Sequence, residues 1–83
     1  MWQNLVVEQL ERLRKSNGGN FDLEINDNAV IASYGSMHGV KVLPENGGYK
    51  VVAWNHSPPY NGGIYELPEH AAIAAFAALR VVG

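Results

Sequence analysis

The fold is decided by the stretch FDLEINDNAVIASY, residues 21–34. Residues 21–25 alternate apolar and polar side chains, which is the period of a strand that has one buried face. The three polar residues 26–28 favour a turn, and residues 29–34 are again mostly apolar. The stretch therefore predicts a β-hairpin with two antiparallel strands.

The segment before this hairpin predicts a helix over residues 2–16. Apolar residues recur there every three or four positions, as they do along one face of a helix, and charged residues occupy many of the others. Arg14 and Lys15 fall in the last turn, where the helix dipole favours cations. The sequence Ser-Asn-Gly-Gly at residues 16–19 tolerates positive φ angles and ends the helix.

Further extended segments follow the hairpin at residues 40–43 and 49–55. Residues 64–67 form either a short fifth strand or an extended connection. Short links between consecutive strands favour an antiparallel meander. We therefore expect one α+β domain over residues 1–83, with a four- or five-stranded antiparallel meander sheet flanked by an N-terminal and a C-terminal helix.

The C-terminal helix is predicted over residues 68–82, and residues 71–79 contain no polar side chain. On a helical wheel Ile73, Phe76 and Leu79 form one stripe, which we expect to face the core. The other side carries small residues at Ala71, Ala74, Ala75 and Ala78. Two interpretations remain open for this alanine face. It is an interface with a second copy of the chain, because small residues let another backbone approach closely, or it simply faces water.

Composition narrows the class of protein. The chain of 83 residues is 47% hydrophobic and 17% charged, with a net charge of -2, so it is rich in core residues. A domain that holds nucleic acid electrostatically is usually strongly basic, which this chain is not. It contains no cysteine, no recognisable signal peptide and no apolar run long enough to cross a bilayer. We expect a cytoplasmic protein that does not associate with membranes.

The second face of the predicted sheet is unusually apolar for a water-facing surface. If alternate strand residues face the core, this second face carries Asp22, Glu24, Lys41, Lys50, Ile31, Leu43, Val52 and Trp54. Three explanations remain open. The two helices cover opposite faces of the sheet, the face binds a protein, or Trp54 with Lys41, Lys50 and His56 forms a stacking platform for single-stranded nucleic acid.

Two loops of the meander are expected at the same end of the sheet, residues 34–39 and residues 55–63. Aromatic, imidazole and amide side chains gather there, and such side chains suit a recognition surface. We predict a partner-binding site formed by Trp54, His56, Tyr60, His38 and Asn61. The alternative is that Trp54 belongs to the core and Tyr60 only covers the end of the sheet.

The same loops carry serine and histidine residues, but catalysis is not expected. Neither serine is framed by a strand–turn–helix elbow, and no buried carboxylate is evident to orient a histidine. No recognised metal-ligand spacing occurs among His38, His56, Glu66 and His70. Phosphate-binding glycine motifs are also absent from the sequence. We therefore expect no enzymatic activity, no metal and no cofactor.

Residues 62–79 begin Gly-Gly-Ile-Tyr-Glu-Leu-Pro-Glu-His-Ala-Ala and resemble the strand–turn–helix of plant AP2-type and integrase-arm DNA-binding domains. The resemblance implies DNA reading by arginines and tryptophans on a three-stranded sheet. The corresponding strands here carry Lys41, Lys50 and Trp54 but no arginine, and a helix precedes the sheet. In format, as a small acidic α+β domain without cysteine, the chain is similar to phage-encoded inhibitors such as anti-CRISPR proteins.

These observations favour a non-enzymatic protein-interaction module, specifically a small inhibitor that docks onto a larger protein complex. A homodimer is a second expected form of association. The alternative function is a small nucleic-acid-binding module that uses the tryptophan and lysine residues of the sheet face.

Overall fold

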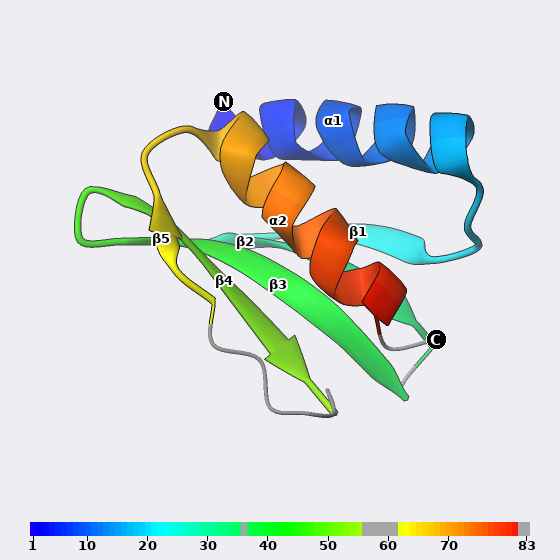
Figure 1. Ribbon diagram of the computed structural model, residues 1–83. Helices are drawn as coiled ribbons and strands as arrows, with labels where there is room; N and C mark the ends of the chain where they lie inside the picture. Colours follow the sequence, from blue (N-terminus) through cyan, green and yellow to red (C-terminus); the bar gives the residue numbers. More distant parts are fainter. Residues whose placement is uncertain (36, 56–61, 82–83) are drawn as a thin grey trace.

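A computed structural model describes residues 1–35, 37–55 and 62–81 of the chain. A helix opens the fold, five strands follow, and a second helix closes it (Figure 1). The elements are α1 (Trp2–Asn17), β1 (Asp22–Asn26), β2 (Ala29–Tyr34), β3 (His38–Glu45), β4 (Gly48–Trp54), β5 (Ile64–Tyr65) and α2 (Pro68–Val81). The predicted α+β order is confirmed, and the fifth strand is present although it is only two residues long.

The five strands form one antiparallel sheet in the order β1-β2-β3-β4-β5. Two-residue turns close the hairpins β1–β2 and β3–β4. At the second of these, Asn46 and Gly47 have φ angles of 50° and 79°, which matches the twist of the flanking strands. β5 pairs with β4 through Tyr49 and Lys50. The sheet is thus a meander of neighbouring strands.

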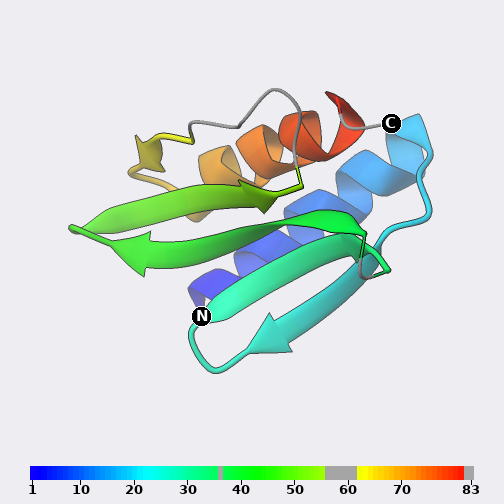
Figure 2. The same cartoon turned by 90° about the horizontal axis from the view of Figure 1, so that it is seen from below.

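Both helices cover the same face of the sheet. Figure 1 shows α1 and α2 side by side above the strands, and Figure 2 shows the other face in front with both helices behind it. Two adjacent helices, each about 10 Å wide, match the width of a sheet whose strands are about 4.8 Å apart. The explanation that the helices cover opposite faces was therefore wrong, and the second face of the sheet is open in the described part of the chain.

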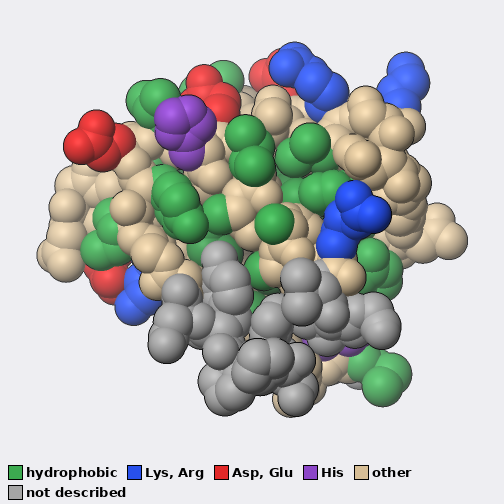
Figure 3. Space-filling view, in the orientation of Figure 1, with side chains coloured by type: hydrophobic (Ala, Val, Ile, Leu, Met, Phe, Trp, Pro, Cys, Tyr) green, Lys and Arg blue, Asp and Glu red, His purple; other side chains and the backbone are tan. Residues whose placement is uncertain are grey.

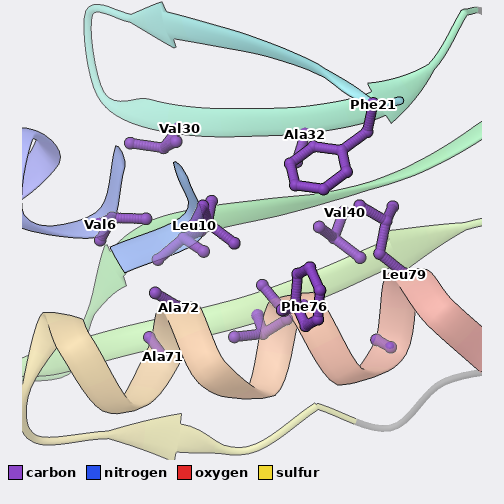
Figure 4. Close-up of a cluster of buried hydrophobic side chains, with 14 residues drawn as sticks. Val6, Leu10, Phe21, Val30, Ala32, Val40, Ala71, Ala72, Phe76 and Leu79 are labelled. Atoms are coloured by element: carbon purple, nitrogen blue, oxygen red, sulfur yellow. The ribbon is translucent and has the colours of Figure 1, made fainter. Parts of the chain in front are cut away.

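The core lies between the helix layer and the sheet (Figure 4). Phe21, just before β1, meets Phe76 of α2 edge to face, with the ring centroids 6.0 Å apart. The other large buried side chains come from both helices and the three central strands: Val6, Leu10, Val30, Val40, Val42, Val51 and Leu79. Residues at alternate positions of the strands supply this core, as a sheet with one covered face requires.

The alanine face of α2 lies inside the molecule. Ala71 and Ala75 are 0% exposed, and Ala78 is also buried, while Ala74 is half-buried against the core. Both interpretations left open for this face, an interface with a second copy and a water-facing surface, placed it outside the core, and the buried alanines contradict both. The expected placement of Ile73 in the core was also wrong, since Ile73 is 47% exposed. Methyl side chains let the backbone of α2 approach its neighbours closely. The alanines therefore face the interior, and the larger Ile73 points to the outside of the helix.

Two side chains of α1 fix this helix to the hairpin. Nε2 of the buried Gln3 donates hydrogen bonds to the carbonyl oxygens of Asn26 at 2.6 Å and Ala29 at 3.4 Å. At the other end of the helix, Nη1 of Arg14 donates to the Phe21 carbonyl oxygen at 2.7 Å. The Arg14 guanidinium also lies 5.1 Å from the centre of the Phe21 ring. α1 is therefore anchored at both ends of β1.

Candidate protein-interaction surface

The open face of the sheet is the candidate functional surface. Its side chains are ordered by strand pairing into rows that cross the sheet. One row runs Glu24, Ile31, Lys41 and Val52, and the next runs Asp22, Ser33, Gly39 and Trp54. Alternation along each strand turns these residues away from the helices, whereas their neighbours Val40, Val42 and Val51 are buried. We call the two rows, together with Leu43, Lys50 and Ile64, the open face.

Trp54 is seated on Gly39 at one end of this face. A Cβ atom placed on Gly39 would lie 2.6 Å from Cη2 and 2.7 Å from Cζ2 of Trp54. The six-membered part of the indole therefore covers the backbone of its cross-strand partner. Trp54 is half-buried and stands outside the main core cluster. The alternative that Trp54 is a core residue does not hold.

Further apolar side chains continue from Trp54 across the open face. Val52 is 37% and Ile64 is 47% exposed, while Ile31 and Leu43 are half-buried. Cγ2 of Ile64 occupies the position over Gly48, where an added Cβ would meet it at 2.6 Å. The two glycines thus give the larger side chains room to lie along the sheet. A patch of this kind, bordered by charged residues, resembles the core and rim of a protein interface.

Charged side chains divide the open face. Asp22 and Glu24 are exposed on the edge strand β1, whereas Lys41 and Lys50 lie on β3 and β4 and are half-buried. Lys50 forms an ion pair with Glu45, with Nζ 3.4 Å from Oε2. Asp22 and Glu24 therefore lie at the β1 edge of the face, while Glu45 accompanies the two lysines toward its other side. The lysines do not form an uninterrupted basic stripe.

The predicted partner-binding cluster is split by the strand register. His38 pairs with Tyr34, one position before the Gly39–Trp54 pair, and therefore faces the opposite side of the sheet from Trp54. The His38 and Tyr34 ring centroids lie 4.9 Å apart. Nε2 of His38 is buried, without a hydrogen-bond partner within the described residues. The other predicted members, His56, Tyr60 and Asn61, lie outside the residues that the structure describes.

The expected neighbourhood of the two loops is found where the structure describes them. Asn55, just after β4, donates a hydrogen bond from Nδ2 to the carbonyl oxygen of Met37, which precedes β3. These two residues join the connection between β2 and β3 to the exit from β4. The prediction that both segments lie at one end of the sheet is therefore correct for Met37 and Asn55.

Apolar side chains are also exposed outside the open face. Hydrophobic side chains also gather over α2 on the helix side of the molecule (Figure 3). The largest exposed ones of the helices and their flanks include Leu5, Leu67 and Ile73. A small hollow beside the β3–β4 turn is lined by Trp2, Tyr49 and residues 44–48, with the Trp2 and Tyr49 ring centroids 5.2 Å apart. This hollow is formed by the adjoining ends of β3 and β4, the turn between them and Trp2 of α1.

Within residues 1–35, 37–55 and 62–81 there is no group of three or more side chains arranged to hold a metal ion. Among the same residues, neither helix has the length and hydropathy that a membrane crossing needs. In the part of the chain that the structure describes, the elements form a two-layer α+β domain in which both helices cover the same side of the sheet. Comparisons with protein-family models, curated proteins and solved structures find no match to the chain.

Proposed function

We propose that this chain is a non-enzymatic protein-interaction module that binds its partner through the open face. The observation that carries the proposal is the placement of both helices on one side of the sheet. Trp54, Val52 and Ile31 are left on the other side, in adjacent rows. An antiparallel sheet that only faces water usually carries polar residues there. Each square ångström of apolar surface that a partner removes from water contributes about 25 cal/mol.

Trp54 is the proposed anchor of the interaction. Tryptophan is enriched among the few residues that supply most of the binding energy in protein interfaces. The contact with Gly39 already restricts the indole in the free protein. Little side-chain freedom is then lost when a partner covers it, and this preorganisation favours binding.

The specific form that we propose is a small cytoplasmic inhibitor that docks onto a larger protein complex. The support is indirect and comes from size, composition and the position of the face. A domain of 83 residues presents one sheet face with an acidic edge formed by Asp22 and Glu24. Such a domain inhibits by covering a surface of its target. That mode of action requires no catalytic group.

The alternative function is binding of single-stranded nucleic acid by Trp54, Lys41 and Lys50. The presence of an aromatic ring and a cation on one sheet face favours it. Against it, each row of the face also holds an acid, and Glu45 pairs with Lys50 at 3.4 Å. Titration with labelled oligonucleotides at low salt tests the alternative. Salt-sensitive binding that Trp54→Ala abolishes would replace our proposal with this one.

The proposal is tested by affinity capture with matched surface variants. Val52 on the open face and Ile73 on α2 are both exposed β-branched residues. Immobilised wild-type protein and Ile73→Lys are expected to retain the same protein from an extract of the source cells, whereas Val52→Lys loses it. A charge at the centre of an interface must be desolvated, so the loss is expected to be large. Equal retention by both variants, with unchanged melting temperatures, would place the binding surface elsewhere.

A further inference from the structure

We infer that the open face also pairs two copies of this chain, sheet against sheet, about a twofold axis that runs parallel to the strands. The inference rests on the proposed function, because it names a partner for the same face. Its support is the distribution of charge across the rows. Asp22 and Glu24 lie on the edge strand β1 and Lys41 lies on β3, while Lys50 is already paired with Glu45, so the two rows are complementary to themselves when the order of their strands is reversed.

The first row shows this complementarity. Its order across the sheet is Glu24, Ile31, Lys41 and Val52. A twofold axis parallel to the strands places the row of one copy over the same row of the other copy, with the order of the residues reversed. Glu24 of one copy then lies above Val52 of the other. Glu24 is then one strand away from Lys41 of that copy. Because a twofold interface repeats every contact, the carboxylate–ammonium pair forms twice.

The dimensions of stacked sheets allow this contact. Sheets that pack face to face are separated by about 10 Å, and neighbouring strands by about 4.8 Å. Extended glutamate and lysine side chains that point toward each other can bridge such a gap. The half-buried stem of Lys41 lies between Ile31 and Val52, so its methylene groups add to the apolar contact while the ammonium group reaches the carboxylate.

The second row adds a polar contact of the same symmetry. It reads Asp22, Ser33, Gly39 and Trp54, and its reverse places Asp22 of one copy over the indole of the other. The indole N–H is a donor only and the carboxylate is an acceptor, so the two groups match. Because the ring lies over Gly39, it projects little above the sheet, and a second sheet can approach this end of the face.

Two directions are possible for a twofold axis in the plane of the interface, parallel or perpendicular to the strands, and charge favours the parallel one. A twofold axis perpendicular to the strands would place each strand over its own copy. Where that axis runs along the first row, Glu24 would lie over Glu24 of the second copy and Lys41 over its Lys41. Juxtaposed like charges disfavour an interface. The axis parallel to the strands is therefore the arrangement that the described charges support.

A charge exchange tests the inference by sedimentation over a concentration series. The wild-type protein is expected to form a dimer that weakens as salt is added, because salt screens the ion pairs. Glu24→Lys and Lys41→Glu should each weaken dimerisation by about tenfold or more, since each removes both symmetry-related pairs. The double variant Glu24→Lys, Lys41→Glu should recover most of the loss. Glu8→Lys and Lys15→Glu, exposed on α1, make the same charge changes away from the face and should leave dimerisation unchanged.

The outcomes separate this inference from the proposed function. A wild-type chain that stays monomeric at millimolar concentration overturns the second copy as a partner, while the capture experiment with Val52→Lys still decides whether the face binds another protein. A dimer whose double variant is as weak as the two single variants overturns the pairing of Glu24 with Lys41. A dimer whose stability does not depend on salt also contradicts the charge argument. Circular dichroism of every variant verifies that it is folded.

Discussion

The indole ring of Trp54 occupies the space that a side chain at Gly39 would need. The two residues are opposite each other on β4 and β3. A Cβ atom on Gly39 would also come within 2.6 Å of the Ala32 carbonyl oxygen, so both a ring and a backbone atom close the site. The shape of this part of the open face therefore depends on the absence of a side chain at one position.

Gly39→Ala is expected to destabilise the protein by about 1–3 kcal/mol, because the new methyl group must displace the ring or shift the backbone. Gly63→Ala is the control, since a Cβ atom there would meet nothing within 4 Å. Urea unfolding of the two variants and the wild type measures the difference. If both glycine variants unfold at the same denaturant concentration, the ring does not hold its position over Gly39.

Ala75→Glu is expected to destabilise the folded chain by several kcal/mol, because it places an unpaired carboxylate in a site with 0% exposure. Ala77→Glu makes the same change at an exposed position of the same helix and should be nearly neutral. Thermal unfolding followed by circular dichroism distinguishes the two. Similar melting temperatures would show that Ala75 faces solvent and would reopen the alanine face as an interface.

Gln3→Ala is expected to lower the free energy of unfolding by about 1–3 kcal/mol, because the carbonyl oxygens of Asn26 and Ala29 lose the hydrogen-bond donor that α1 supplies. Asn4→Ala is the matched control, as the next residue of the helix is exposed. Alanine favours a helix in both cases, so propensity alone would stabilise both variants. Chemical denaturation gives the two free energies of unfolding, and a stabilised Gln3→Ala would contradict the anchoring role.

Arg14→Met is expected to lower stability by about 1–3 kcal/mol, since it removes the hydrogen bond to the Phe21 carbonyl oxygen and the cation over the Phe21 ring. Arg12→Met is the control, because it makes the same substitution at an exposed position. The hydrogen bond of Arg12, to Gln9, is 3.5 Å long. Scanning calorimetry of both variants provides the test. Equal losses would mean that the effect comes from net charge and not from Phe21.

Local patterns in the sequence were sufficient for the order of elements. The alternation after Phe21 and the period of the first helix each depend on a few neighbouring residues, and both predicted elements are present. The side of the sheet that each helix covers depends on long-range packing, which short connections do not determine. The alternation of residues 21–25 assigns Ile25 to the buried face of its strand, but Ile25 is 52% exposed, because β1 is an edge strand of the sheet.

The composition of the candidate surface was only partly predictable. Hydrophobicity ranks isoleucine above alanine, yet Ile73 is exposed and Ala75 is buried, because the distance between helix and sheet decides which size fits. His38 was expected in a loop beside Trp54. In the structure β3 begins at His38, so the strand register assigns that side chain to the opposite face.

The contact between the first and last helices has a consequence for synthesis of the chain. α1 and α2 lie side by side, although all five strands separate them in the sequence (Figure 1). While the chain is being made, the inner side of the sheet and the apolar stripe of α1 remain without their cover until residues 68–81 leave the ribosome. Nascent chains expose such surface to chaperones and to aggregation. The core of this domain can therefore be covered only after α2 has been synthesised.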